Sequence, residues 1–205
     1  MTEIKYVIFD IGDTIYPYTL QPLNDLMLQH TTDKNAFLNG HSASDYCYQP
    51  YMRGEIKHQD LVKELCQFCY VPYNDKIIPL IDTAFRQGRG AMFKETLQAM
   101  QLCRSCGMEI GILSNALPVL SDAKIDLAKP EYIFVSYELG LLKPDIKIFQ
   151  TLANKLQAAP VQILFIDDKE RNITAAKQIG INGIIFNKDT ILKEISAFLP
   201  ENSHH

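Results

Sequence analysis

The stretch FDIGDTIYP, residues 9–17, overlaps the end of an apolar run, YVIF at 6–9. A run of this kind is typical of a strand that is buried on both faces of a parallel sheet. Two carboxylates, Asp10 and Asp13, stand where that strand ends. In open α/β sheets, ligands bind beyond the carboxyl ends of the strands. The stretch therefore predicts the first strand of such a sheet and a candidate site at its end.

Four further apolar runs, rich in Ile, Val and Phe, predict four more buried strands. They are EIGIL at 109–113, YIFVS at 132–136, QILFI at 162–166 and GIIF at 183–186. Helical patterns lie between most of these runs, and strand–helix alternation indicates a doubly wound sheet. The predicted fold class is therefore α/β, with a Rossmann-like, doubly wound parallel sheet as its core.

The segment between the first two strands is too long for a simple crossover. It contains helical patterns such as QPLNDLMLQH and HQDLVKELCQFCY and shows no clear strand. We therefore expect a helical domain, residues 16–90, inserted into a core domain made of residues 1–15 and 91–205. The linkers are expected near Tyr16–Tyr18 and Gly88–Gly90.

Composition and charge argue against several classes of function. The 205 residues are 47% hydrophobic, which suffices for a sizeable core. The net charge is −4 and Lys and Arg form no stripe, which argues against nucleic acid binding. No apolar run approaches the roughly 20 residues that span a bilayer, and the N-terminus lacks a signal-peptide pattern. We expect a cytoplasmic protein, monomer or homodimer, that binds neither nucleic acid nor membrane.

Two CxxC pairs, Cys66/Cys69 and Cys103/Cys106, raise the alternative of a zinc site. Both pairs lie in segments with a helical pattern, whereas structural zinc usually draws such pairs from tight turns. We therefore expect free thiols that are buried or half-buried, which suits a reducing compartment.

Polar residues stand at or beyond the ends of the first four predicted strands. They are, in order, Asp10 and Asp13, Ser114 and Asn115, Lys143 in a loop, and Asp167 with Asp168. Carboxylates that converge raise one another's pKa unless a positive charge compensates. Mg²⁺ supplies such a charge, held by carboxylates and substrate phosphate, and Lys143 supplies another. Ser114 is able to donate to phosphate oxygens. The residues therefore indicate Mg²⁺-assisted phosphoryl chemistry, with a carboxylate available as nucleophile.

The chain resembles the haloacid dehalogenase-like hydrolase superfamily, whose members are mostly phosphatases that work through an aspartyl-phosphate. FDIGDT resembles the first family motif, D-x-D-G-T after a strand. ILSNA resembles the second motif, LGLLKPD the third and FIDDKERNITAAKQIG the fourth. The inserted helices resemble the family's cap domain, which closes over the site and selects the substrate. The resemblance spans essentially the whole chain.

The resemblance implies a Mg²⁺ site at the first and fourth motifs. Asp10 would be the nucleophile, and Asp10 and Asp168 would bind Mg²⁺ directly. The main-chain carbonyl of Gly12 would be a further ligand. Asp167 would be either a ligand or one step removed through water.

The resemblance also implies how the substrate is held. Ser114 and Asn115 would hold the transferring phosphoryl group, and Lys143 would bridge that group and Asp10. Side chains of the inserted helices and linkers are further candidates for substrate contact. They are Arg53, Arg86, Arg89, Tyr16, Tyr18, Tyr46, Tyr48 and Tyr51.

The first motif departs from the family pattern at one position. The family places its acid–base aspartate two residues after the nucleophile, where this chain has Gly12, and Asp13 stands one place later. Adjacent side chains of an extended segment point to opposite faces, so Asp13 replaces the missing group only if the loop is rearranged. Three alternatives follow. The substrate has a good leaving group, such as a sugar 1-phosphate or an acyl phosphate; Asp13 reaches the site through the permissive Gly12 backbone; or the site binds phosphate without useful turnover.

The expected function is a Mg²⁺-dependent phosphatase for a small phosphorylated metabolite, with sugar phosphates among the candidates. One alternative is a catalytically weak phosphate-binding or regulatory protein of the same fold. Another is a 2-haloacid dehalogenase, although family dehalogenases lack the metal-binding pair that Asp167 and Asp168 resemble.

Overall fold

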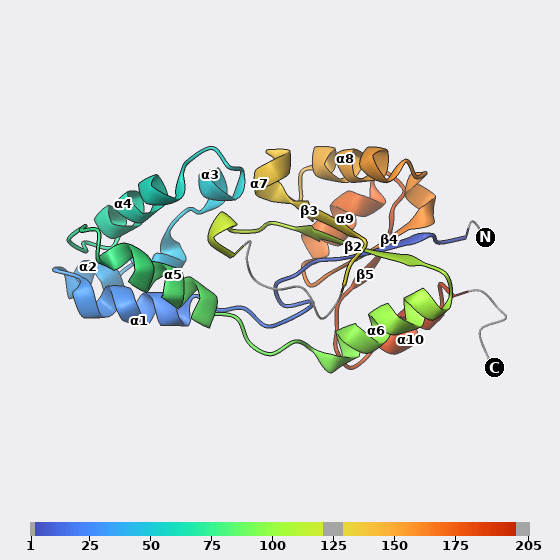
Figure 1. Cartoon of the computed structure of the whole chain (residues 1–205), viewed down its shortest axis with the longest axis horizontal. Helices are drawn as coiled ribbons and strands as arrows, with labels where there is room; N and C mark the ends of the chain where they lie inside the picture. Colours follow the sequence, from blue (N-terminus) through green and yellow to red (C-terminus); the bar gives the residue numbers. More distant parts are fainter. Residues whose placement is uncertain (1–2, 121–128, 200–205) are drawn as a thin grey trace.

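The core of the protein is a parallel sheet, seen in a computed structural model that describes residues 3–120 and 129–199. Within these residues the sheet has five strands in the order β3-β2-β1-β4-β5 (Figure 1). The strands are β1 (Tyr6–Phe9), β2 (Glu109–Ser114), β3 (Tyr132–Val135), β4 (Ile163–Asp167) and β5 (Asn182–Ile185). Each lies within one residue of its predicted bounds. The predicted α/β fold class with a Rossmann-like sheet is confirmed.

Helices cover both faces of the sheet (Figure 1). They are α6 (Lys94–Ser105) and α10 (Ile191–Ser196) on one face, and α8 (Ile146–Leu156) and α9 (Glu170–Lys177) on the other. Side chains of β1 alternate between the two layers. Val7 and Phe9 join the cluster under α6 and α10, and Ile8 joins the opposite cluster. The three central strands, β1, β2 and β4, are buried on both faces and are continuous apolar runs, whereas the edge strands β3 and β5 expose Ile133 and Ile185.

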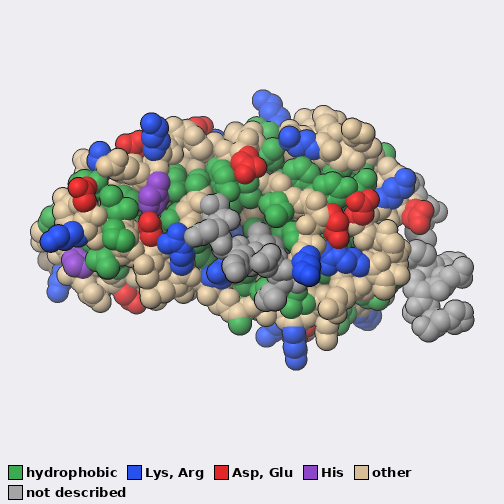
Figure 2. Space-filling view, viewed as in Figure 1, with side chains coloured by type: hydrophobic (Ala, Val, Ile, Leu, Met, Phe, Trp, Pro, Cys, Tyr) green, Lys and Arg blue, Asp and Glu red, His purple; other side chains and the backbone are tan. Residues whose placement is uncertain are grey.

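The remaining short helices of the core lie in its connections. They are α7 (Ser136–Leu139) after β3 and the 3-10 helices η2 (Pro118–Leu120) after β2 and η3 (Pro160–Gln162) before β4. Among the described helices, none combines the length and the apolar character needed to cross a bilayer. Lys and Arg side chains are interspersed with Asp and Glu on the face shown in Figure 2.

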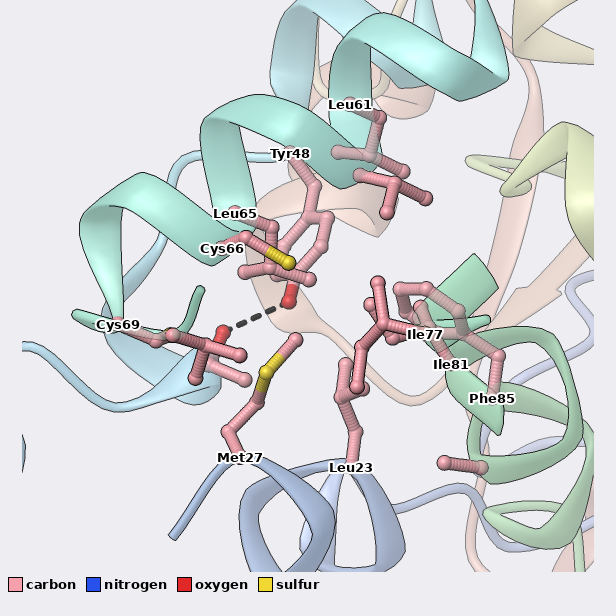
Figure 3. Close-up of a cluster of buried hydrophobic side chains, with 14 of the residues drawn as sticks. Leu23, Met27, Tyr48, Leu61, Leu65, Cys66, Cys69, Ile77, Ile81 and Phe85 are labelled. Carbon is pink, nitrogen blue, oxygen red and sulfur yellow. Dashed lines mark hydrogen bonds between the residues drawn. The ribbon is translucent and has the colours of Figure 1, made fainter. Parts of the chain in front are cut away.

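The chain between β1 and α6 forms a helical layer beside the sheet, here called the helical insertion (Figure 1, left). Its helices are α1 (Gln21–His30), α2 (Lys34–Leu38), η1 (Ala43–Asp45), α3 (Gln49–Met52), α4 (His58–Phe68) and α5 (Ile77–Gln87). Leu61 and Leu65 of α4 and Ile81 and Phe85 of α5 are spaced four apart and face one cluster (Figure 3). The helical insertion therefore has a hydrophobic core of its own.

Two paired segments join the helical insertion to the sheet. Tyr18 and Arg89 form an antiparallel bridge, and the Thr19 N–H donates to the Gly88 carbonyl at 2.9 Å. A Cβ at position 88 would collide with the Thr19 carbonyl oxygen, so this close approach requires glycine. Residues 18–19 and 88–89 thus run side by side.

The cysteines are free thiols in the described structure. Cys66 and Cys69 lie within the hydrophobic cluster of the helical insertion (Figure 3), and Cys103 is buried under the sheet. Among the described residues, one group of three or more His, Cys, Asp or Glu side chains is placed to share a metal ion. That group contains no cysteine. Neither CxxC pair is therefore part of that group.

Candidate active site

Three strand ends meet at one edge of the sheet. Because β1 lies between β2 and β4, Asp10 stands between Ser114 at the end of β2 and Asp167 at the end of β4. The ladder continues through Asp10, whose N–H donates to the Ile166 carbonyl at 2.8 Å. The strand order thus brings together residues that are far apart in the sequence.

Lys143 lies buried between two of the carboxylates. Its Nζ is 2.7 Å from Asp10 Oδ1 and 2.6 Å from Asp167 Oδ2, and it donates to the Leu113 carbonyl at 2.9 Å. Only 4% of the residue is exposed. An ammonium group has three hydrogens to donate, so all of them have acceptors here. Lys143 therefore offsets part of the negative charge that the strand ends concentrate.

Asn115 holds the main chain of Lys143. Its Nδ2 donates to the Lys143 carbonyl and its Oδ1 accepts from the Lys143 N–H, both at 2.9 Å. Because both ends of the amide are engaged, Asn115 orients the loop that carries the lysine. Ser114, the residue before it, is buried and lines the cavity described below.

Asp167 has hydrogen bonds at both carboxylate oxygens. Its Oδ1 accepts from the Lys169 N–H at 2.9 Å and from Asn172 Nδ2 at 2.8 Å. Its Oδ2 accepts from Lys143 and, at 3.0 Å, from Asn172. Asn172, which is buried on α9, was not predicted as a site residue from the sequence. One sequence feature could have indicated this role: Asn172 is a polar residue four positions before Ala176, on the apolar face of a helix.

Asp168 differs from Asp167 because its Oδ1 is buried without a hydrogen-bond partner. The Lys169 ammonium is 3.8 Å away. Burial raises the pKa of Asp168 to about 6; Lys169 opposes the rise, and Asp10 and Asp167 add to it. Burial also raises the pKa of Asp10, and the Lys143 ammonium counteracts that rise. The three carboxylates Asp10, Asp167 and Asp168 also outnumber the two lysine ammonium groups beside them.

The same carboxylates are placed to share a cation. Asp10, Asp167 and Asp168 each offer an oxygen, and these oxygens lie within 4.8 Å of one another. Hard oxygen donors with excess negative charge suit Mg²⁺. The unpartnered Oδ1 of Asp168 is the kind of atom that such an ion satisfies. The residues present therefore fit a bound Mg²⁺.

The loop after Asp10 gives Asp13 a different position from that of the family acid. Asp13 takes a φ of 56°, its N–H donates to the Tyr16 carbonyl at 2.8 Å, and its Oδ1 accepts from the Tyr18 N–H at 3.1 Å. No atom lies within 4 Å of the point where a Cβ on Gly12 would stand. Asp13 thus closes the turn into the linker, and position 12 borders open space.

A cavity of about 230 Å³ opens above these groups. Its described lining includes every residue that the sequence analysis proposed for the site except Asp167 and Asp168. Of the arginines and tyrosines proposed for substrate contact, Tyr16 and Tyr18 line it. The others, Arg53, Arg86, Arg89, Tyr46, Tyr48 and Tyr51, are not among its described lining residues. Arg89 instead packs over the Tyr16 ring, 5.4 Å from its centroid.

The site thus consists of carboxylates and a buried lysine at the strand ends of a Rossmann-like sheet. The family model of the haloacid dehalogenase-like hydrolases matches residues 4–180. The chain belongs to that family.

Curated relatives agree with this assignment, and solved structures share the fold. The sesquiterpene phosphatase astK of Aspergillus oryzae is 23% identical over 89% of this chain and 90% of its own length. A HAD family enzyme from Bacteroides thetaiotaomicron, solved with magnesium and inorganic phosphate, has a TM-score of 0.73 at 19% identity. The match covers 90% of this chain and 95% of the Bacteroides chain. The mouse acyl-CoA dehydrogenase family member 10 is 25% identical over 95% of this chain, which spans 19% of that protein. The chain is thus a HAD-like hydrolase that resembles phosphatase members of the family.

Proposed function

We propose that the protein is a Mg²⁺-dependent phosphatase that hydrolyses a small phosphorylated metabolite through an aspartyl-phosphate on Asp10. One observation carries this proposal: Asp10, at the end of the central strand, shares the Lys143 ammonium with Asp167. Beside this pair, Asp168 keeps an unpartnered buried oxygen. Phosphoryl transfer depends mostly on positioning and on stabilising charge, and this arrangement offers both.

Each residue then has a role in that reaction. Asp10 attacks phosphorus, and Lys143 stabilises the charge that develops on the equatorial phosphoryl oxygens. Ser114 donates to one of these oxygens. Asn115 positions Lys143 through the hydrogen bonds to its main chain.

Asp10, Asp168 and the main-chain carbonyl of Gly12 are the proposed Mg²⁺ ligands. Bound there, Mg²⁺ supplies electrostatic stabilisation of the phosphate oxygens. Asp167 is proposed to contact Mg²⁺ through water and not directly, because both of its oxygens already accept hydrogen bonds from the protein. It holds Lys143 in place for the reaction.

The absence of a carboxylate at position 12 determines which leaving groups suit the site. Asp13 is committed to the Tyr18 N–H, so we propose that it closes the turn and does not protonate the leaving oxygen. General acid–base catalysis typically contributes about 10²–10⁴-fold. Esters with good leaving groups need this help least, and they are the expected substrates. The helical insertion is proposed to act as the cap that admits them.

The test is hydrolysis of p-nitrophenyl phosphate with Mg²⁺ present. We expect activity in the wild type, its loss in Asp10→Asn, and normal activity in Asp189→Asn, which makes the same change on an exposed loop. Activity that persists in Asp10→Asn, or in excess chelator, would contradict the mechanism. Halide release from 2-haloacids without metal would indicate a dehalogenase instead.

Gly12 favours a second candidate, a protein that binds phosphate without useful turnover. Beryllofluoride with Mg²⁺ imitates an aspartyl-phosphate and distinguishes the two. A functional nucleophile responds with a higher Tm, which disappears in Asp10→Asn. A degenerate site hydrolyses no ester and shows no rise in Tm.

A further inference from the structure

Part of the cavity above Asp10 is lined by apolar side chains. Four of its described lining residues, Tyr18, Met52, Leu117 and Leu120, present apolar surface, and we call them the apolar wall. Met52 ends α3 of the helical insertion, and Leu117 and Leu120 belong to the segment that follows β2. A leaving group attached to a phosphate at Asp10 would extend into the space that this wall borders.

Three members of the apolar wall belong to or pack against the core of the helical insertion, and Tyr18 packs against the cluster under α6 and α10. Leu117 is 5% exposed and belongs to the same buried cluster as the α4 and α5 side chains, and Met52 and Leu120 pack against that cluster. The Tyr18 hydroxyl donates to the Phe85 carbonyl at 3.3 Å. Its oxygen is therefore turned towards α5, and Tyr18 is also one of the residues that line the cavity. The wall is thus held in place, and its apolar surface is preformed.

Several of the polar side chains that line the same cavity are already engaged within the protein. Asn115 uses both ends of its amide on Lys143, whose ammonium has three acceptors. Asp13 accepts from the Tyr18 N–H. Lys169 and Arg171 also line the cavity, and as cations they suit a phosphate better than a hydroxyl. The apolar wall itself carries one hydroxyl, that of Tyr18, which is already engaged, so hydroxyl groups of a substrate placed against this wall would lose hydrogen bonds to water and regain few.

We propose that the substrate of this site is a phosphate monoester whose leaving group is a hydrocarbon or aryl body, in preference to a sugar. The inference rests on the proposed function only in placing the phosphate at Asp10. Burial of methylene groups against the apolar wall supplies the affinity, because each buried CH₂ strengthens binding several-fold. Sugar phosphates, which the sequence left among the candidates, fit this wall less well.

The experiment compares the binding of two non-hydrolysable phosphonates in the presence of Mg²⁺. Hexylphosphonate carries a six-carbon apolar chain, and a polyhydroxylated six-carbon phosphonate carries a sugar-like one. Titration calorimetry is expected to give a Kd at least tenfold lower for hexylphosphonate. Leu120→Gln and Met52→Gln are each expected to reduce this preference at least threefold. Leu38→Gln makes the same kind of change at a 69% exposed position of α2 and is expected to leave it unchanged.

The outcomes separate this inference from the proposed function. Preferential binding of hexylphosphonate without hydrolysis of any ester supports the inference and contradicts the phosphatase. Hydrolysis of acetyl phosphate, which has almost no leaving-group body, together with equal binding of the two phosphonates supports the phosphatase and overturns the inference. A preference that survives both Leu120→Gln and Met52→Gln also overturns it, because the apolar wall would not be its source. Failure of both phosphonates to bind overturns it as well.

Discussion

Lys143 Nζ lies 2.7 Å from Asp10 Oδ1, at a site where both side chains are almost fully excluded from water. The lysine comes from a loop after β3 and the aspartate from the end of β1, so the pair ties two distant parts of the chain together. Removal of one partner from a buried ion pair leaves an uncompensated charge, which costs about 3–5 kcal/mol.

Lys143→Met is therefore expected to lower the free energy of unfolding by about 3 kcal/mol or more at neutral pH. The loss should be smaller at mildly acidic pH, where protonation of the carboxyl groups relieves their repulsion. Urea unfolding at the two pH values measures this, with Lys188→Met on an exposed loop as the control. A loss no larger than that of the control would show that the pair contributes nothing to stability.

Asp168 gives the metal-free protein a pH-dependent stability. Its pKa rises from 3.8 to about 6 on folding, so the folded state holds an extra proton between these values. Stability attributable to this group therefore falls as the pH rises through that window, and it stays low above the window. In chelator at neutral pH, Asp168→Asn is expected to stabilise the protein by about 1–3 kcal/mol.

Thermal unfolding of wild type and Asp168→Asn across the pH range tests this expectation. The difference should vanish below the lower end of the window, and Mg²⁺ should raise the Tm of the wild type more than that of the variant. A variant that is less stable than wild type in chelator at neutral pH would contradict the account.

Gly12→Asp is expected to restore the acid that the first motif lacks. Position 12 borders open space, so the new side chain has room. Alkyl phosphates release an alkoxide, which is a poor leaving group, so their hydrolysis should rise about 10²-fold. Hydrolysis of p-nitrophenyl phosphate, which has a good leaving group, should change much less. Gly12→Asn has the same shape and transfers no proton, so it should show neither effect. Equal rates for the two variants would show that position 12 is not the acid–base position.

Asn172 is expected to act as a positioning residue through its two hydrogen bonds to Asp167. Removal of a group that orients a metal site typically lowers the metal affinity 10–100-fold. Asn172→Ala should therefore raise the Mg²⁺ concentration needed for half-maximal activity by at least about tenfold. Asn154→Ala, on an exposed part of α8, is the matched control. A lower Tm with an unchanged Mg²⁺ requirement would indicate a purely structural role.

The sheet was predictable because its central strands are buried on both faces, and all five strands appear in the sequence as short apolar runs. The strand-end rule then placed Asp10, Ser114 and Asp167 together. The hydrogen bonds of Asn115 and Asn172 were not predictable, because each depends on how a loop or helix returns to a strand end. The apolar wall could not be predicted either. Met52 and Leu117 are ordinary core residues in the sequence, and only the packing of the helical insertion places them beside the phosphate position.

The central claim is that Asp10 carries the phosphoryl group, and chemical trapping tests it most directly. The enzyme is mixed with an aryl phosphate and Mg²⁺, quenched in acid and reduced with borohydride, which converts an aspartyl-phosphate into homoserine. Tandem mass spectrometry is expected to find homoserine at position 10, and to find none when Mg²⁺ is removed by chelation. Homoserine at another carboxylate, or ester hydrolysis with none at position 10, would contradict the account.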